Sequence, residues 1–368
     1  MNVTFLVILI KICMNCLSFW WYFFGGIKLK DLLQTPYEEM VIACLKDSEK
    51  ADYDAIVSQY VHCNERKLFE FANQHEVATI IAMRLRHLGK SSPLWNGPTD
   101  DWKYRLTQRF EKLDALVSCL EASNIRVMAL KNAAIARAIY PVWEECPMGN
   151  FDLLVLPEDL ERTGVIFADN GMTHVEHTKK SFSQEYHAEL SDDELWIKLQ
   201  TRPFTDPTGT TDMSAFVRRM FDRSLSVDGT PLRIPSPEDH LLLICMSILR
   251  RRYVCVPGIR MYTEIDRVIR RSPFFTWNKF IEQARFVGTA IYFALYIPKM
   301  LLDTPIPENV FDAFRPTKTA FTRFMRVIRQ TGLFYPPKNL SFFRECQMLS
   351  ALYATPKDIC RAIYYRER

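Results

Sequence analysis

The 368-residue sequence predicts an α+β protein, with a small mixed sheet between a helical N-terminal part and a helical C-terminal part. Apolar residues recur at helical spacing up to about residue 122 and again after residue 235. Between these regions, short apolar runs alternate with helical segments, as in strand–helix–strand units. Hydrophobic residues make up 48% of the chain and charged residues 24%, which is typical of a soluble globular protein.

These patterns divide the chain into four parts: a hydrophobic segment (1–28), a helical lead (29–122), an α/β core (123–234) and a C-terminal helical domain (235–368). Residues 3–27 carry one charge, on Lys11, and are long enough to span a bilayer. Three interpretations stay open for this segment. It is a membrane anchor or interfacial helix, a helix that packs on the protein itself or on a protein partner, or an over-extended start before Met14.

The ten cysteines are scattered, which favours reduced thiols in the cytoplasm, with membrane association through residues 3–27 as the open alternative. The net charge of +4 gives no specific signal for nucleic acid. The run of three arginines at 250–252 follows an apolar helical pattern. It is typical of a solvated helix end, and contact with phosphate is the alternative.

In the helical lead, Lys67–Leu88 has an amphipathic pattern that predicts one helix ending at Gly89. Ser91–Asp100 is predicted as a loop from its Pro, Gly, Asn and Ser content, and Asp101–Ala122 as a further helix.

In the core, the expected strands are residues 125–130, 151–156, 183–190 and 194–200, and the expected helices are residues 132–138 and 157–169. Ser236 begins the C-terminal domain as a helix N-cap, followed by Pro237 and two acidic residues. Further helical patterns cover residues 259–271, 276–302 and 318–332.

Asn150 and Asp152 lie two residues apart where the second core strand begins, so their side chains are expected on the same face. Two carboxylates at this spacing can share a Mg²⁺ ion that also holds the phosphates of a nucleotide. Here the first residue of the pair is an amide. Whether the protein is an enzyme therefore depends largely on this position.

The segment Leu130-Lys131-Asn132-Ala133-Ala134, the pair Tyr140-Pro141 and the segment Cys146–Val155 together resemble a family of uncharacterised bacterial nucleotidyltransferase-like proteins. The similarity extends over roughly residues 30–315. The resemblance implies a DNA polymerase β-like nucleotidyltransferase core. It also implies transfer of a nucleotidyl group from an NTP, with Mg²⁺ as cofactor, to an unknown acceptor.

The resemblance also implies site residues. Asp152 would be the catalytic metal ligand and Asn150 a weak second ligand, while Lys131, Asn132 and Gly149 would contact the nucleotide. Glu194 is the only acid in phase for a third catalytic carboxylate, and Glu189 is a weaker substitute.

Three positions depart from the family pattern. Asn132 stands in place of glycine, Cys146 in place of arginine, and Asn150 in place of the first aspartate. Two hypotheses follow. The chain is either an active transferase or an inactive homologue that acts as a binding, scaffold or membrane-associated partner protein. Mg²⁺-dependent NTP binding distinguishes them: it is expected to be weak and to be strengthened by Asn150→Asp, whereas tight binding that is lost in Asp152→Ala would exclude the inactive homologue.

Overall fold

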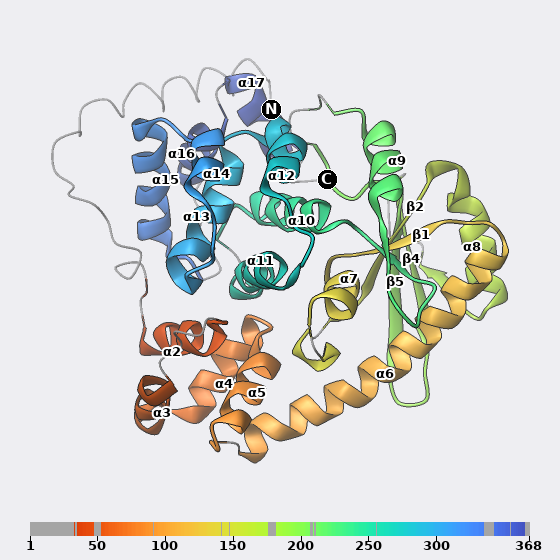
Figure 1. Ribbon diagram of the computed structural model, residues 1–368, viewed down its shortest axis with the longest axis horizontal. Coiled ribbons are helices and arrows are strands. Elements are labelled where there is room, and N and C mark those ends of the chain that lie inside the picture. The colour runs from red at the N-terminus through yellow and green to blue at the C-terminus, as the bar shows by residue number, and fades with distance from the viewer. Residues whose placement is uncertain are drawn as a thin grey trace.

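The structure is a computed structural model that describes residues 33–364 except residues 34, 48–52, 91, 141, 147, 176–181, 207–208, 210, 255, 335–341 and 354. The hydrophobic segment 3–27 lies outside the described residues, and so do all three interpretations of it. Within the described part, no helix is both long enough and apolar enough to cross a membrane. The predicted α+β class is confirmed: many helices surround one mixed sheet (Figure 1).

The N-terminal part consists of helices α2 (Pro36–Leu45), α3 (Tyr53–His62), α4 (Glu65–Gln74), α5 (Ala78–His87) and the long α6 (Pro93–Ala122), which reaches from these helices to the sheet (Figure 1). The prediction of one helix over Lys67–Leu88 is wrong, because the backbone breaks at Glu76, which has a left-handed φ of 55°. The predicted loop over Ser91–Asp100 is also wrong. Pro93 lies at the first helical position, where proline is favoured, and Trp95 is fully buried, so packing continues the helix.

The sheet has the strand order β3-β4-β5-β2-β1-β7-β6. Its strands are β1 (Val127–Leu130), β2 (Phe151–Val155), β3 (Thr173–Val175), β4 (Ser183–Glu189), β5 (Glu194–Gln200), β6 (Leu225–Ser226) and β7 (Arg233–Ile234). The sheet is mixed, because β2 pairs antiparallel with β1 and parallel with β5.

The two faces of the sheet differ in polarity. On one face, Phe151 of β2 stacks on Phe110 of α6, with ring centroids 4.9 Å apart. On the same face, Tyr186 of β4 meets Phe167 of α8 (Leu160–Asp169) edge-on at 5.1 Å. The opposite face carries Asp152 and its cross-strand neighbour Lys198. The apolar face therefore anchors the sheet, and the polar face is left for a site.

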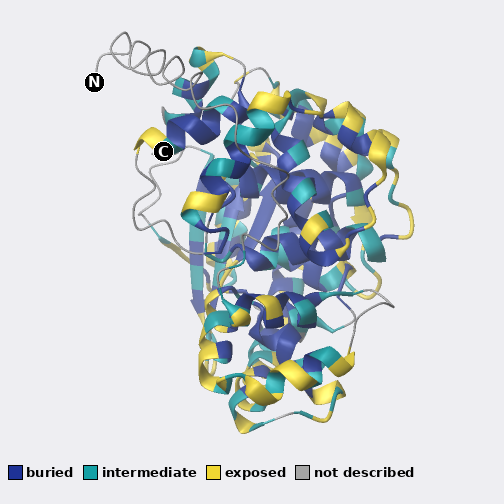
Figure 2. Ribbon diagram, turned by 90° about the vertical axis from the view of Figure 1, so that its left-hand side faces the viewer, coloured by how far each residue is buried: buried dark blue, intermediate teal, exposed yellow. Residues whose placement is uncertain are grey.

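Helices α7 (Lys131–Ala138) and α9 (Met213–Arg223) connect the strands. The C-terminal part contains α10 (Pro237–Arg250), α11 (Ile259–Arg271), α12 (Trp277–Ala284), α13 (Ala290–Leu302), α14 (Glu308–Ala313), α15 (Lys318–Thr331), α16 (Phe342–Leu352) and α17 (Pro356–Tyr364). The Ser236 cap is confirmed, since its hydroxyl accepts from the Asp239 amide. The predicted helix over 276–302 is divided near Gly288, which has a φ of 69°. Buried residues fill the interior of the body in Figure 2.

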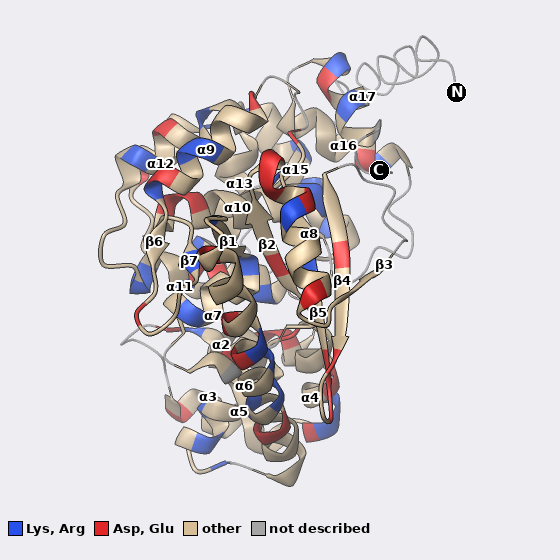
Figure 3. Ribbon diagram, turned by 90° about the vertical axis from the view of Figure 1, so that its right-hand side faces the viewer, with Lys and Arg blue, Asp and Glu red and all other residues tan. Residues whose placement is uncertain are grey.

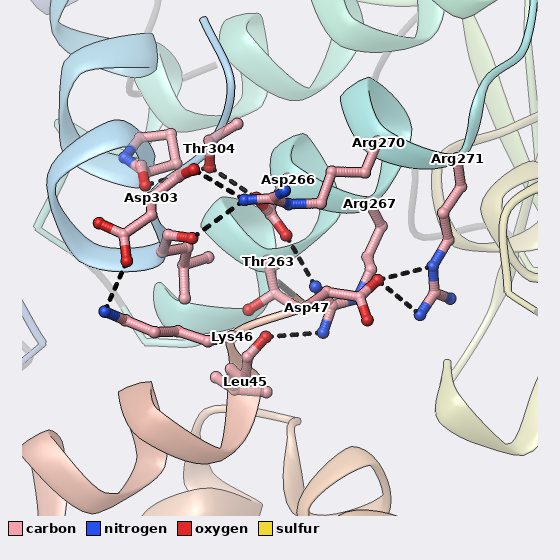
Figure 4. Close-up of polar contacts among 12 residues, drawn as sticks. Leu45, Lys46, Asp47, Thr263, Asp266, Arg267, Arg270, Arg271, Asp303 and Thr304 are labelled. Carbon is pink, nitrogen blue, oxygen red and sulfur yellow. Dashed lines mark hydrogen bonds and ion pairs between the residues drawn. The ribbon is translucent and has the colours of Figure 1, made fainter. Parts of the chain in front are cut away.

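A buried ion network joins the N-terminal helices to the C-terminal ones (Figure 4). Asp266 is fully buried and pairs with Arg267 at 2.7 Å and with Arg270 at 2.9 Å. Thr304 also donates to the Asp266 carboxylate at 2.8 Å. Arg267 in turn donates to the Leu45 carbonyl oxygen at 2.7 Å. Every polar atom of the Asp266 carboxylate is thus engaged, which is what a buried charge requires.

Two buried imidazoles predict an acid-sensitive fold. Burial lowers the pKa of both His75 and His240 to about 4, below the roughly 6.5 of an exposed imidazole. Protonation therefore favours the unfolded chain. This contribution to stability is complete above about pH 6.5 and is lost as the pH falls towards about 4.

We expect the free energy of unfolding to fall between pH 7 and pH 5 by about 2 kcal/mol for each of these imidazoles. His240→Gln should flatten that slope in urea titrations at the two pH values. The exposed His62 offers a control, since His62→Gln should leave the slope unchanged. Equal slopes in wild type and His240→Gln would contradict the assignment.

Candidate functional site

Asp152 lies in the middle of the sheet, on the polar face. Its register partners are Leu130 of β1 on one side and Lys198 of β5 on the other. Only 8% of Asp152 is exposed. Because a buried carboxylate needs opposite charge or hydrogen-bond donors, the neighbours of Asp152 decide what it does.

The Asp152 carboxylate already forms an ion pair with a lysine ammonium group. Lys131 follows strand β1 directly with a φ of 50°, and its Nζ lies 2.7 Å from Asp152 Oδ1. Gln200 of β5 donates to the same oxygen in a longer contact of 3.5 Å. The left-handed turn at Lys131 thus places a cation on the Asp152 carboxylate.

The turn at Lys131 and Asn132 is fixed by contacts with other side chains rather than left open for a ligand. The Asn132 amide nitrogen lies 3.2 Å from Glu264 Oε1, and its oxygen lies 3.1 Å from Arg260 Nη1, in the orientation that satisfies both groups. Cys146 is buried, and its thiol donates to the Asn132 carbonyl oxygen at 3.7 Å. Burial raises the pKa of the Cys146 thiol well above its usual value.

Three other predicted site residues lie away from the Lys131–Asp152 pair. Asn150 is exposed in the bend before β2, where it lines a narrow pocket with Trp196. Gly149 is exposed next to it, and a Cβ added there would touch nothing within 4 Å. Glu194 accepts from the Trp196 indole at 2.9 Å. It lies four strand positions before Lys198, about 13 Å along β5. The structure therefore does not bring Glu194 to Asp152.

The residues present do not fit the Mg²⁺ that the family resemblance implies. Mg²⁺ is held through carboxylates and requires near-ideal octahedral geometry. Here Asp152 accepts from Lys131, and the strand position beside it, where an acid would help, holds Lys198. Among the described residues, no group of three or more His, Cys, Asp or Glu side chains could hold a metal ion.

The polar face of the sheet borders a cleft that we call the basic cleft. It lies between β5, the start of α7, the loop at residues 202–205 and helices α10 and α11, and it encloses about 100 Å³. Its lining includes six cationic side chains: Lys131, Lys198, Arg202, Arg250, Arg251 and Arg260. Elsewhere both signs of charge are spread over the elements (Figure 3). The cleft is therefore a local concentration of positive charge.

One carboxylate, Glu264 of α11, lies among these cations. Burial raises its pKa, while the charges of Arg260, Arg251 and Lys131 act in the opposite direction. Arg260 pairs with Glu264 at 3.0 Å and also with Glu76 of the N-terminal part. Arg250 and Arg251 are exposed at the end of α10. The cleft thus has two cationic side chains, Arg250 and Arg251, that take no part in the ion pairs of Arg260.

Sequence reasoning identified Asp152 and Lys131 but did not select Arg202, Lys198 or Arg260. Lys198 carried one usable signal, since it alternates with Gln200 on the polar side of the strand expected beside Asp152. For Arg202 and Arg260 the sequence contains no such signal, because only the tertiary fold brings these two residues together.

The mixed sheet carries an aspartate on β2 and a short helix that opens directly after β1, an arrangement consistent with a nucleotidyltransferase-like fold. A family model described as "Uncharacterised nucleotidyltransferase" matches residues 63–303. This match covers more than half of the chain, so the chain belongs to that family. Neither the comparison with curated proteins nor the comparison with solved structures finds a match.

Proposed function

We propose that this chain binds the polyphosphate of a nucleotide in the basic cleft without a divalent metal, and that it does not carry out metal-dependent nucleotidyl transfer. The observation that carries the proposal is the 2.7 Å pair between Lys131 and Asp152. In this pair, a lysine supplies the positive charge that the family mechanism assigns to a metal.

The charge and the size of the cleft both favour phosphate as its ligand. Arginine presents several N–H donors in a plane that matches phosphate oxygens, and such charge-assisted hydrogen bonds are among the strongest in proteins. The enclosed 100 Å³ is below the roughly 300–1,000 Å³ of pockets that bury a whole small molecule. The phosphates therefore enter the cleft, while the sugar and base stay at its mouth.

The residues of the turn support binding rather than catalysis. The Asn132 side chain is bonded to Arg260 and Glu264, so it holds the cleft wall in place. The two carboxylates of the described cleft are both paired, Asp152 with Lys131 and Glu264 with Arg260, so neither is free to take the proton of an acceptor hydroxyl. The acceptor predicted from the family resemblance has no role in this proposal.

The second candidate is an active transferase, and one observation favours it: Asp152 is retained at the family position on β2. In that case the Lys131 side chain would have to leave Asp152 when Mg·NTP binds. Nucleotide affinity would then depend on Mg²⁺ and on Asp152.

The proposal is tested by titrating the protein with AMP, ADP, ATP and inorganic triphosphate by calorimetry in EDTA. We expect affinity to rise with each added phosphate, because each brings charge to the cationic lining. Inorganic triphosphate should bind about as tightly as ATP. Equal affinity for AMP and ATP, or no binding in EDTA, would contradict the proposal.

A further inference from the structure

A second cavity, of about 250 Å³, lies between the N-terminal helices and the loop that precedes β2. We call it the aromatic cavity, because Phe69, Trp95 and Trp102 lie in its wall. Gly149 of the family motif contributes to the opposite part of the lining. The aromatic cavity has no lining residue in common with the basic cleft, so it is a separate site.

One hydroxyl in the wall of the aromatic cavity has no hydrogen-bond partner among the described residues. Thr79, in the first turn of α5, lines the cavity and is 3% exposed. Its hydroxyl has no hydrogen-bond partner among the described residues. A buried polar group without a partner is costly, and buried groups in native proteins are almost always satisfied. The hydroxyl therefore indicates a ligand or water that enters the cavity.

The size and the charge of the cavity narrow the class of ligand. A dry apolar cavity of about 150 Å³ holds a benzene ring, so in proportion about 250 Å³ holds a ring system of roughly ten atoms. The one charged side chain in the described lining is Glu76, which already pairs with Arg260. A neutral ligand therefore fits better than an ion. Aromatic walls favour a flat ring that stacks on them.

We propose that the aromatic cavity binds a neutral bicyclic heteroaromatic ring of the size of a purine base, with a polar edge bonded to Thr79. This goes beyond phosphate binding, because it concerns a different cavity. The two sites are neighbours nonetheless: Glu76 lies in the wall of the aromatic cavity, and its partner Arg260 lies in the wall of the basic cleft.

The experiment titrates the full chain with adenine, and with indole as a less polar ring of similar size, and follows the calorimetric heat. We expect saturable adenine binding at least about tenfold tighter than indole binding, since indole has a single N–H donor and lacks the acceptor nitrogens and the amino group of adenine. No saturable adenine binding, or indole binding as tight as adenine, would overturn the proposal. The first result would mean that only water fills the cavity.

Two variants separate ligand binding from folding. Ala78→Leu fills the cavity and should abolish adenine binding, while Thr79→Val should weaken it about tenfold and raise the melting temperature of the free protein.

Arg251→Gln, in the basic cleft, should leave adenine binding unchanged. Loss of adenine binding in Arg251→Gln would contradict a separate site. Failure of ATP to bind the wild type would refute phosphate binding alone and leave the adenine result standing.

Discussion

Asp266→Asn is expected to lower the free energy of unfolding by about 3–5 kcal/mol, the range measured when one partner of a buried ion pair is removed. The carboxylate is fully buried and faces both Arg267 and Arg270. Asparagine keeps the shape but removes the charge, so Arg270 loses its counterion and Arg267 keeps only the longer 3.5 Å contact with Asp47. Urea unfolding followed by circular dichroism measures the effect.

The network also predicts which helices lose stability in Asp266→Asn. Because Arg267 donates to the Leu45 carbonyl oxygen, Asp266→Asn should loosen the N-terminal helices as well as α11. Hydrogen exchange should therefore rise in α2. Asp101→Asn is the matched control, since Asp101 pairs with Arg105 on the surface and its loss should change little. A loss no larger than that of the control would contradict a network that joins the two parts.

Arg250→Gln combined with Arg251→Gln is expected to weaken ATP binding by about 100-fold, or about tenfold for each charge-assisted hydrogen bond lost. Both residues line the basic cleft at the exposed end of α10. Neither is part of the Arg260–Glu264 pair, so the fold should be retained. Calorimetric titration in EDTA gives the change in affinity, and circular dichroism checks the fold.

The salt dependence of binding gives a second measure of the same effect. Added salt screens exposed charges, so wild-type affinity should fall as salt rises and the double variant should respond less. Arg66→Gln serves as the control, because the Arg66 side chain is 84% exposed on α4, outside the cleft. If the double variant bound ATP as tightly as the wild type, the phosphates would have to bind outside the basic cleft.

Local patterns predicted much of the fold. Residues 151–156 and 194–200 were expected as strands because of their apolar runs and alternation, and β2 and β5 occupy almost the same residues. Ser236 was expected as a cap from its own side chain and the residues that follow it. The errors have tertiary causes. The left-handed backbone at Glu76 and the burial of Trp95 depend on packing that no local pattern contains.

The candidate site was only half predictable. Asp152 and Asn150 could be selected from the sequence, because residues two apart on a predicted strand point to the same face. The pairing of Lys131 with Asp152 needs a left-handed turn at a lysine, which residue preferences do not predict. The opposition of Lys198 to Asp152 depends on strand register across two elements that lie more than forty residues apart. The basic cleft therefore appears only in three dimensions.

In the proposed function, Lys131 rather than a metal ion provides the positive charge at Asp152. The most direct test compares ATP affinity in EDTA and in excess Mg²⁺, for the wild type and for Asp152→Asn, by calorimetry. We expect ATP to bind the wild type in EDTA, Mg²⁺ not to strengthen this binding, and Asp152→Asn not to weaken it. ATP binding that requires Mg²⁺ and is lost in Asp152→Asn would show instead that Asp152 belongs to an active metal centre.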